Sequence, residues 1–173
     1  ERIREHGLDV VLVDAGIVGE PLATPDVPRE AVAAAVGADV KALAGAGDRG
    51  AAVEVMARGA AEVVKRLHAE GRLDAIGGLG GSGGSSLATY AMRQLPIGVP
   101  KLMDSVVDIA GVNRISAQIM TNAAAALAGM AQAAVPPLGE EKRLITASMF
   151  GVTTAAVTTV PDDNARLGIL PSG

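Results

Sequence analysis

Apolar and polar residues follow one another in blocks whose spacing predicts helices and strands in turn. Glu1–His6 is the end of a helix that Gly7 terminates, because glycine readily adopts the conformation needed after a last helical turn. Leu8–Val13, LDVVLV, is an almost continuous apolar run, which is typical of a parallel strand covered on both faces. Gly19–Pro28 holds three prolines and predicts a surface excursion, and Arg29–Val36 predicts a short helix.

The strongest helix signal begins at Asp48, a residue type that is favoured at N-caps. Apolar residues at helical spacing, with charged residues between them, predict an amphipathic helix that ends near Glu70 and is followed by Gly71. The next blocks predict a strand, a helix and a strand, at Leu73–Leu79, Ser85–Leu95 and Val99–Met103. This alternation predicts an α/β fold with a Rossmann-like open parallel sheet, whose ligands bind at the carboxyl ends of the strands.

The pattern changes at Asp104, where a long alanine-rich helix is predicted to run to Ala134. Small residues recur on it every four positions and give a smooth face that suits either internal packing or a subunit interface, at Ala125, Gly129 and Ala133. Lys142–Phe150 predicts a further strand, and Pro161 opens a very short helix. We therefore expect a first Rossmann-like subdomain with its linking helix at 1–134 and fragments of a second at 135–173.

Some junctions lack the residues that complete elements need. The sequence starts inside a predicted helix, with no strand before Glu1. It then passes from the strand that ends at Met103 into the helix predicted at Asp104 without residues that could form a turn. After about Thr159 no complete element forms. We expect residues to be absent at these three places, so that most of the second subdomain is missing.

The segment IGGLGGSGGSS, Ile76–Ser86, holds the most suggestive chemistry. Its place between a predicted strand and a predicted helix argues against a linker. Glycines allow positive φ and close approach to a ligand, so that successive N–H groups and the positive end of the next helix can bind an anion. We predict a phosphate-binding loop at Gly80, Gly81, Ser82, Gly83, Gly84 and Ser85. Lys101 either reaches the same phosphate or is a solvated lysine.

Two motifs overlap this segment. Gly78–Gly83 matches G-x-G-x-x-G, and Asp104 lies where that dinucleotide fingerprint expects an acid that binds ribose. Glycine is so frequent in this segment that the motif can match by chance. The spacing from the motif to Asp104 also depends on the junction between Met103 and Asp104, where residues are expected to be absent. Gly80–Gly84 matches G-x-S-x-G with Ser82 as nucleophile, but that arrangement needs a later histidine, and His6 and His68 both precede the serine.

Composition narrows the function classes. With 49% hydrophobic and 20% charged residues the chain is an ordinary globular sequence, whereas a net charge of −4, one Tyr, one Phe and no Trp argue against nucleic acid as a partner. The absence of cysteine excludes disulfides, a thiolate nucleophile and a cysteine zinc site. The longest uncharged run, Leu144–Pro161, is too polar for a membrane helix. A cytoplasmic location is the default expectation.

Several blocks together resemble a known family: Asp48–Gly50 opening a helix with MARGA, then GGLGGSGGSSLATYAMRQLPIGVPKLM, SVVDIAGVNRIS and NAAAALAGM. They are similar to the family that contains the ATP-binding amino-terminal region of the tobamovirus (tomato mosaic virus) resistance protein, whose members are mostly uncharacterised microbial proteins. The resemblance runs from Glu1 to about Thr154. It implies two Rossmann-like subdomains, ATP bound at the glycine-rich segment, a homodimer, and a role near the nucleotide for Asp48 and Arg49.

This chain departs from the family at the junction between Met103 and Asp104, because a Ser-Thr and Gly-rich segment that normally follows KLM is missing. This departure removes the support for Asp104 as a ribose ligand. We expect the protein to bind ATP, with Mg²⁺ held mainly through the phosphates. The alternatives are an NAD(P)-linked oxidoreductase and a nucleotide-gated interaction module without catalysis. No residue stands out as a general base, so slow or no turnover is expected.

Overall fold

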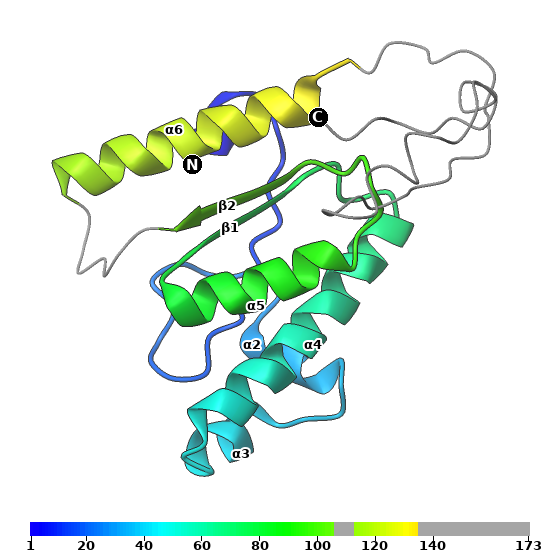
Figure 1. Ribbon diagram of the computed structural model, residues 1–173, viewed down its shortest axis with the longest axis vertical. Coiled ribbons are helices and arrows are strands. Elements are labelled where there is room, and N and C mark those ends of the chain that lie inside the picture. Colours follow the sequence, from blue (N-terminus) through cyan, green and yellow to red (C-terminus); the bar gives the residue numbers. More distant parts are fainter. Residues whose placement is uncertain (106–112, 135–173) are drawn as a thin grey trace, which may run out of the picture. The chain divides into compact units, whose positions relative to one another are not determined.

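The computed structural model describes residues 1–105 and 113–134 (Figure 1). The chain divides into two units, Glu1–Ala133 and Ala134–Gly173, and the first is described below. The strand predicted at Lys142–Phe150 and the helix after Pro161 lie outside the described residues. The elements of the first unit are α1 (Arg2–Glu5), α2 (Arg29–Ala34), α3 (Val40–Gly45), α4 (Arg49–Ala69), β1 (Ile76–Gly80), α5 (Ser82–Arg93), β2 (Lys101–Ser105) and α6 (Arg114–Gln132).

The centre of this unit is a strand–helix–strand motif. Strands β1 and β2 are parallel and in register from Ile76 opposite Lys101 to Gly80 opposite Ser105, and α5 makes the crossover between them. The strands predicted here are confirmed, although both begin two or three residues later than expected. The described fold is thus mixed α/β with a small, open, parallel two-stranded sheet.

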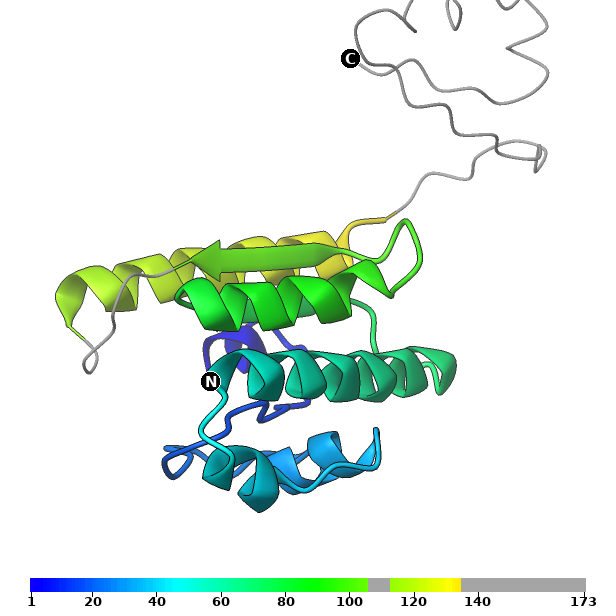
Figure 2. The same cartoon turned by 60° about the horizontal axis from the view of Figure 1, so that its bottom comes forward.

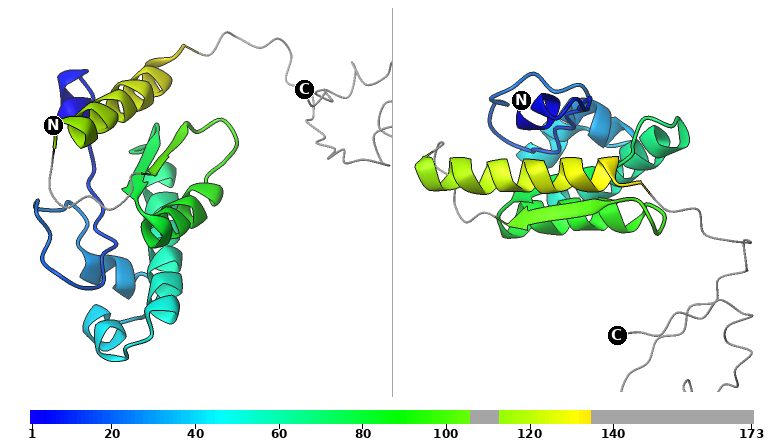
Figure 3. Two further views of the ribbon diagram at one scale, coloured as in Figure 1. Left: turned by 60° about the vertical axis from the view of Figure 1, so that its left-hand side comes forward. Right: turned by 90° about the horizontal axis from the view of Figure 1, so that it is seen from above.

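Helices lie on both faces of β1 (Figures 1 and 3), and only Ile76 and Leu79 among its five residues carry side chains. A Cβ at Gly78 would stand 2.7 Å from the Cβ of Ala88 on α5. A Cβ at the neighbouring Gly77, which faces the other way, would stand 2.7 Å from Cδ2 of Leu127 on α6. Successive residues of a strand point to opposite faces, so these two glycines let α5 and α6 approach the strand from either side.

Helix α4 carries most of the core. Asp48 caps it by accepting a hydrogen bond from the backbone N–H of Ala51 at 3.0 Å, and the helix ends at Ala69, before Gly71 with φ of 66°, both as predicted. Its buried face includes Met56 and Val63, each with no exposed surface, and packs against α2 and α5. Helices α4 and α5 lie side by side and run in the same general direction (Figure 2).

The first predicted strand, Leu8–Val13, is wrong. Within the described residues this run makes only a single-residue parallel bridge, from Val13 to Val27. Leu12 bonds to the same returning segment: Leu12 N donates to Oδ2 of Asp26 at 2.7 Å, and Val27 N donates to Leu12 O at 3.0 Å. The run is therefore held by the loop that follows it, because no described strand lies beside it.

Two further boundaries differ from the sequence prediction. The long helix does not begin at Asp104, since Asp104 and Ser105 complete β2 and α6 begins at Arg114. The Asn113 side chain caps α6 by accepting from Ile115 N and Ser116 N, both at 2.9 Å. Helix α3 was not predicted; Asp39 caps it, and at six residues it is too short to show a periodic apolar face.

Candidate functional site

The glycine-rich segment is a tight turn and a helix start rather than a loop. Strand β1 ends at Gly80, Gly81 is the N-cap of α5, and Ser82 is already helical. The predicted loop Gly80–Ser85 is therefore wrong in its extent. None of its glycines has positive φ, so the nest that left-handed glycines would build is not what the backbone forms here.

Only the first of these glycines is required by close packing. A Cβ at Gly80 would lie 3.0 Å from Cα of Gly84, because the turn folds back against the first turn of α5. At Gly81 no atom would lie within 4 Å, and at Gly84 only the carbonyl oxygen of Leu79, at 3.8 Å. Glycine at these later positions keeps the surface at the helix start free of side chains.

The amino terminus of α5 lacks the side-chain cap that the other long described helices possess. Asp48 caps α4 and Asn113 caps α6, whereas Gly81 has no side chain to offer. The first N–H groups of a helix have no partner within it, and the described residues supply none for the N–H groups of Ser82, Gly83 and Gly84. These donors and the helix dipole make the start of α5 electropositive.

The serine hydroxyls do not all face this opening. Ser85 Oγ donates to the carbonyl oxygen of Gly80 at 3.2 Å, and Ser86 Oγ donates to that of Ser82 at 3.1 Å. The predicted role of Ser85 as a donor to phosphate therefore competes with a bond that ties the helix to the end of β1. The hydroxyl of Ser82, on the first helical residue, makes no hydrogen bond to the described residues.

A cation from a different helix lies at the same place. Arg49 is the first residue of α4, and its Nη2 is 3.5 Å from the position that a Cβ on Gly83 would occupy. Arg49 forms no ion pair within the described part of the chain, whereas Arg58 on the same helix pairs with Glu54 at 3.5 Å. The parallel course of α4 and α5 brings both helix starts to the same side of the unit (Figure 2).

The structure separates Lys101 from this group. Lys101 opens β2 opposite Ile76, at the other end of the strand pair from Gly80. Its Nζ donates to the carbonyl oxygen of Pro96 at 2.7 Å. The sequence could not distinguish the two ends, because the predicted strand placed Lys101 near its middle.

Asp104, in contrast, lies at the carboxyl end of β2, directly opposite Leu79. Its Oδ2 is buried and has no hydrogen-bond partner among the described residues.

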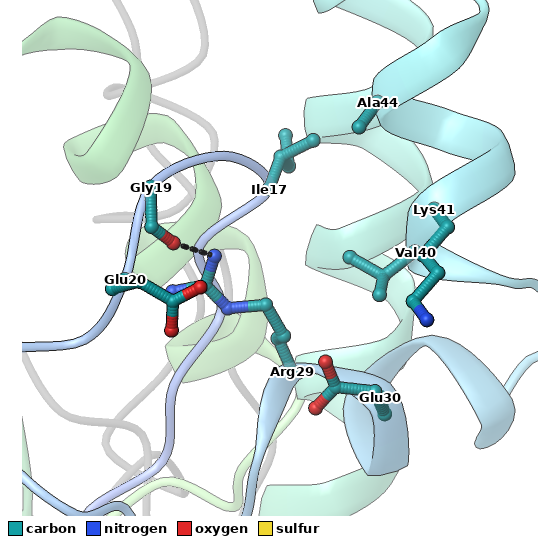
Figure 4. A pocket seen from close by; sticks show the side chains of 8 residues that line it. All are labelled: Ile17, Gly19, Glu20, Arg29, Glu30, Val40, Lys41 and Ala44. Atoms are coloured by element: carbon teal, nitrogen blue, oxygen red, sulfur yellow. Dashed lines mark hydrogen bonds between the residues drawn. The ribbon is translucent and has the colours of Figure 1, made fainter.

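Arg29 and Asp14 form a second polar cluster. Asp14 accepts a hydrogen bond from Gly16 N at 2.8 Å, and its other oxygen accepts one from Nε of Arg29 at 2.7 Å. Arg29 also donates to Gly19 O at 2.6 Å and borders a hollow of about 260 Å³ (Figure 4). Since the guanidinium is held by these protein groups, the cluster serves to fasten the loop before α2.

Two features that the described residues lack bear on the site. No group of three or more His, Cys, Asp or Glu side chains lies close enough together in residues 1–105 and 113–134 to hold a metal ion. None of the helices described has both the length and the apolar character needed to span a membrane.

The sequence matches the N-terminal domain of the uncharacterised protein family UPF0261 over residues 1–105 and 102–136. The chain belongs to this family. The UPF0261 protein of Clostridium tetani is 43% identical over 90% of this chain and 44% of its own length, and UPF0261 protein mlr3387 of Mesorhizobium japonicum is 41% identical over 70% and 35%. The ToMV resistance protein Tm-1 of Solanum lycopersicum is 35% identical over 69% of this chain and 19% of its own length. The predicted resemblance is thus confirmed.

This UPF0261 chain spans less than half the length of these relatives. Its match to the family falls into two segments that meet at residues 102–105, where the sequence predicts absent residues. The alignment with the Clostridium tetani protein is 176 residues long but covers only 90% of the 173 residues of this chain. The Clostridium tetani protein therefore has residues within the aligned span that have no counterpart in this chain.

Proposed function

We propose that this UPF0261 domain binds ATP, with its phosphates at the amino terminus of α5. The observation that carries the proposal is the guanidinium of Arg49 beside Gly83, 3.5 Å from the place of a Cβ there, at a helix start that has no side-chain cap. Backbone N–H groups and a positive helix end bind phosphate, and arginine adds a planar pair of charged donors. The open surface at Gly81 and Gly84 gives the ligand access to both.

The structure alters the set of residues assigned to this role. Donors in the proposed site are the N–H groups of Ser82, Gly83 and Gly84, the hydroxyl of Ser82 and the side chain of Arg49. Gly80 and Ser85 shape the turn, and Asp48 holds the start of α4. Lys101 is no longer included, because it lies at the far end of the strand pair.

Mg²⁺ fits this arrangement only as a companion of the phosphates. A protein cage would need several oxygen ligands, whereas Mg²⁺ commonly keeps waters and binds phosphate oxygens. The carboxylate nearest in sequence to Arg49 is that of Asp48, which is engaged as an N-cap. We expect binding with slow or no hydrolysis, which a phosphate-release assay on the purified protein measures.

Calorimetric titration of the protein with ATP–Mg²⁺ and with NAD(P) tests the ligand. We expect ATP to bind, and tight binding of NAD(P) without binding of ATP would establish the oxidoreductase alternative instead. An interaction module would bind ATP without turnover and change its affinity for a protein partner. The homodimer also stays a prediction, which sedimentation with and without ATP measures.

Two variants test the site itself. Arg49→Gln removes the charge and is expected to weaken ATP binding about tenfold to a hundredfold, since a charge-assisted hydrogen bond contributes about 1.5–3 kcal/mol. Gly83→Val would place a branched side chain against Arg49 and over the N–H groups, and should weaken binding at least as much. Arg58→Gln, on the same helix, is the matched control. Equal affinities for Arg49→Gln and Arg58→Gln would refute the site.

A further inference from the structure

Asp104 stands on the same edge of the sheet as the proposed phosphate site. It is opposite Leu79 in the register, one position before the pair Gly80 and Ser105, and adjacent parallel strands lie about 4.8 Å apart. A ligand held at the start of α5 therefore meets the end of β2 as soon as it extends across the strand pair. The carboxyl edge of a parallel sheet is also where such ligands lie.

One oxygen of this carboxylate has an unmet need for a hydrogen-bond donor. Oδ2 of Asp104 is buried and finds no partner among the described residues. A carboxylate oxygen shielded from water without a donor is costly to the fold, so such groups call for an explanation. Five other aspartates of the described chain have theirs: Asp14, Asp26, Asp39 and Asp48 accept from backbone N–H groups or arginine, and Asp74 is exposed to water.

The residue as a whole is less enclosed than this oxygen, whose own surface is closed to solvent. Asp104 is only partly buried as a whole, and Leu79, which is opposite it and shares its face of the sheet, has 56% of its surface exposed. The face that Leu127 of α6 covers at Gly77 is therefore open at its carboxyl end.

Two of the three glycines of the motif allow close packing between β1 and α5. Gly80 allows the turn to pack on the first turn of α5, and Gly78 allows Ala88 of that helix to approach β1 closely. In this arrangement an acid near the end of the next strand binds ribose hydroxyls. The segment missing before Asp104 removed the support of the sequence for this role, whereas the structure places Asp104 in β2.

We propose that Asp104 accepts hydrogen bonds from the ribose hydroxyls of the bound nucleotide and thereby selects ribonucleotides with a free 2′-hydroxyl. This inference rests on the proposed function. A carboxylate accepts but cannot donate, and the 2′- and 3′-hydroxyls of ribose offer two donors side by side. The same negative charge repels a phosphate at the 2′ position, which disfavours NADP-type ligands.

The test compares ATP, 2′-deoxyATP and adenosine carrying a 2′-phosphate in addition to its 5′-phosphates, each titrated into the unmodified protein. We expect ATP to bind about tenfold more tightly than 2′-deoxyATP, the size of one hydrogen bond to a charged group, and the 2′-phosphate to bind worst. Equal binding of ATP and 2′-deoxyATP would overturn the role of Asp104 and leave the phosphate site standing. If none of the three binds, the phosphate site and this inference both fail.

Asp104→Asn assigns the selectivity to the residue. We expect the preference for ATP over 2′-deoxyATP to shrink and the discrimination against the 2′-phosphate to fall. Asp74→Asn, an exposed aspartate before the amino end of β1, is the matched control and should keep both. Thermal unfolding is measured in parallel: loss of a carboxylate that has no protein partner should leave the midpoint unchanged or higher. A marked drop in the midpoint, with the preference for ATP over 2′-deoxyATP unchanged, would show that Asp104 has a purely structural role.

Discussion

A substitution at Gly59 in α4 tests how this helix packs on α2. This packing sets the position of α4 and therefore that of Arg49. A Cβ at this position would lie 2.2 Å from the carbonyl oxygen of Val32 on α2, 3.0 Å from its carbonyl carbon and 3.1 Å from its Cγ1. The first neighbour is backbone, so no rotamer change can relieve the contact. In Gly59→Ala the two helices must separate by about an ångström, as van der Waals contact between carbon and oxygen requires.

We expect Gly59→Ala to lower the free energy of unfolding by about 1–3 kcal/mol, the usual range for overpacking in a tight core. Alanine also raises helix propensity by about 1 kcal/mol relative to glycine, so the net loss falls in the lower part of that range. Gly129→Ala, in the interior of α6 with no atom within 4 Å of the added Cβ, isolates the propensity term and should raise stability by about 0.5–1 kcal/mol.

Urea unfolding followed by circular dichroism measures both variants. The free energy of unfolding should fall with urea concentration at the same slope in each, so that the midpoints can be compared. The essential result is that the two substitutions change the free energy of unfolding in opposite directions. If Gly59→Ala were as stabilising as Gly129→Ala, α2 would not be packed on α4 as described, and the position of Arg49 would have to be reconsidered.

Three further changes act on single interactions. Asp48→Ala removes the bond to Ala51 N and should cost about 1 kcal/mol, while Asp48→Asn retains most of it; urea unfolding measures both. Asp14→Ala leaves Arg29, whose side chain is 12% exposed, without its carboxylate and should cost about 3 kcal/mol; a loss below 1 kcal/mol in the same assay would contradict a partly buried pair. Gly84→Ala meets only Leu79 O at 3.8 Å, so the thermal midpoint should rise, and an unfolding transition at lower temperature would show that this residue is not helical.

Local signals predicted the ends of α4 better than the first strand. The Asp48 cap and the Gly71 end depend on neighbouring residues only, and both are found. Leu8–Val13 has the composition of a buried strand, but a strand exists only where another pairs with it, and that pairing is a long-range property. Within the described residues the run has a bridge at Val13 and no ladder.

The glycine segment shows the same limit within the site. Glycine is a poor helix former, so the sequence favoured a loop up to Ser85. Contacts from elsewhere decide otherwise: α5 packs on α4 and β1, and the bond from Ser85 to Gly80 O ties its first turn down. No spacing rule connects Arg49 with Gly83, because their proximity arises from the packing of two helices. Only the family resemblance pointed to Arg49.

Three of the five residues of β1 are glycine, and side chains of α5 and α6 fill the space where the Cβ atoms of Gly77 and Gly78 would be. A strand of this kind gains little from burying itself and loses more chain entropy on ordering than a strand without glycine would. It therefore has no reason to form ahead of its neighbours. We expect the pairing of β1 with β2 to be a late event in folding, which completes only after α5 and α6 have arrived, and to have a transition-state φ-value near zero. The proposed phosphate site would then assemble last, as the end of β1 and the start of α5 are fixed together.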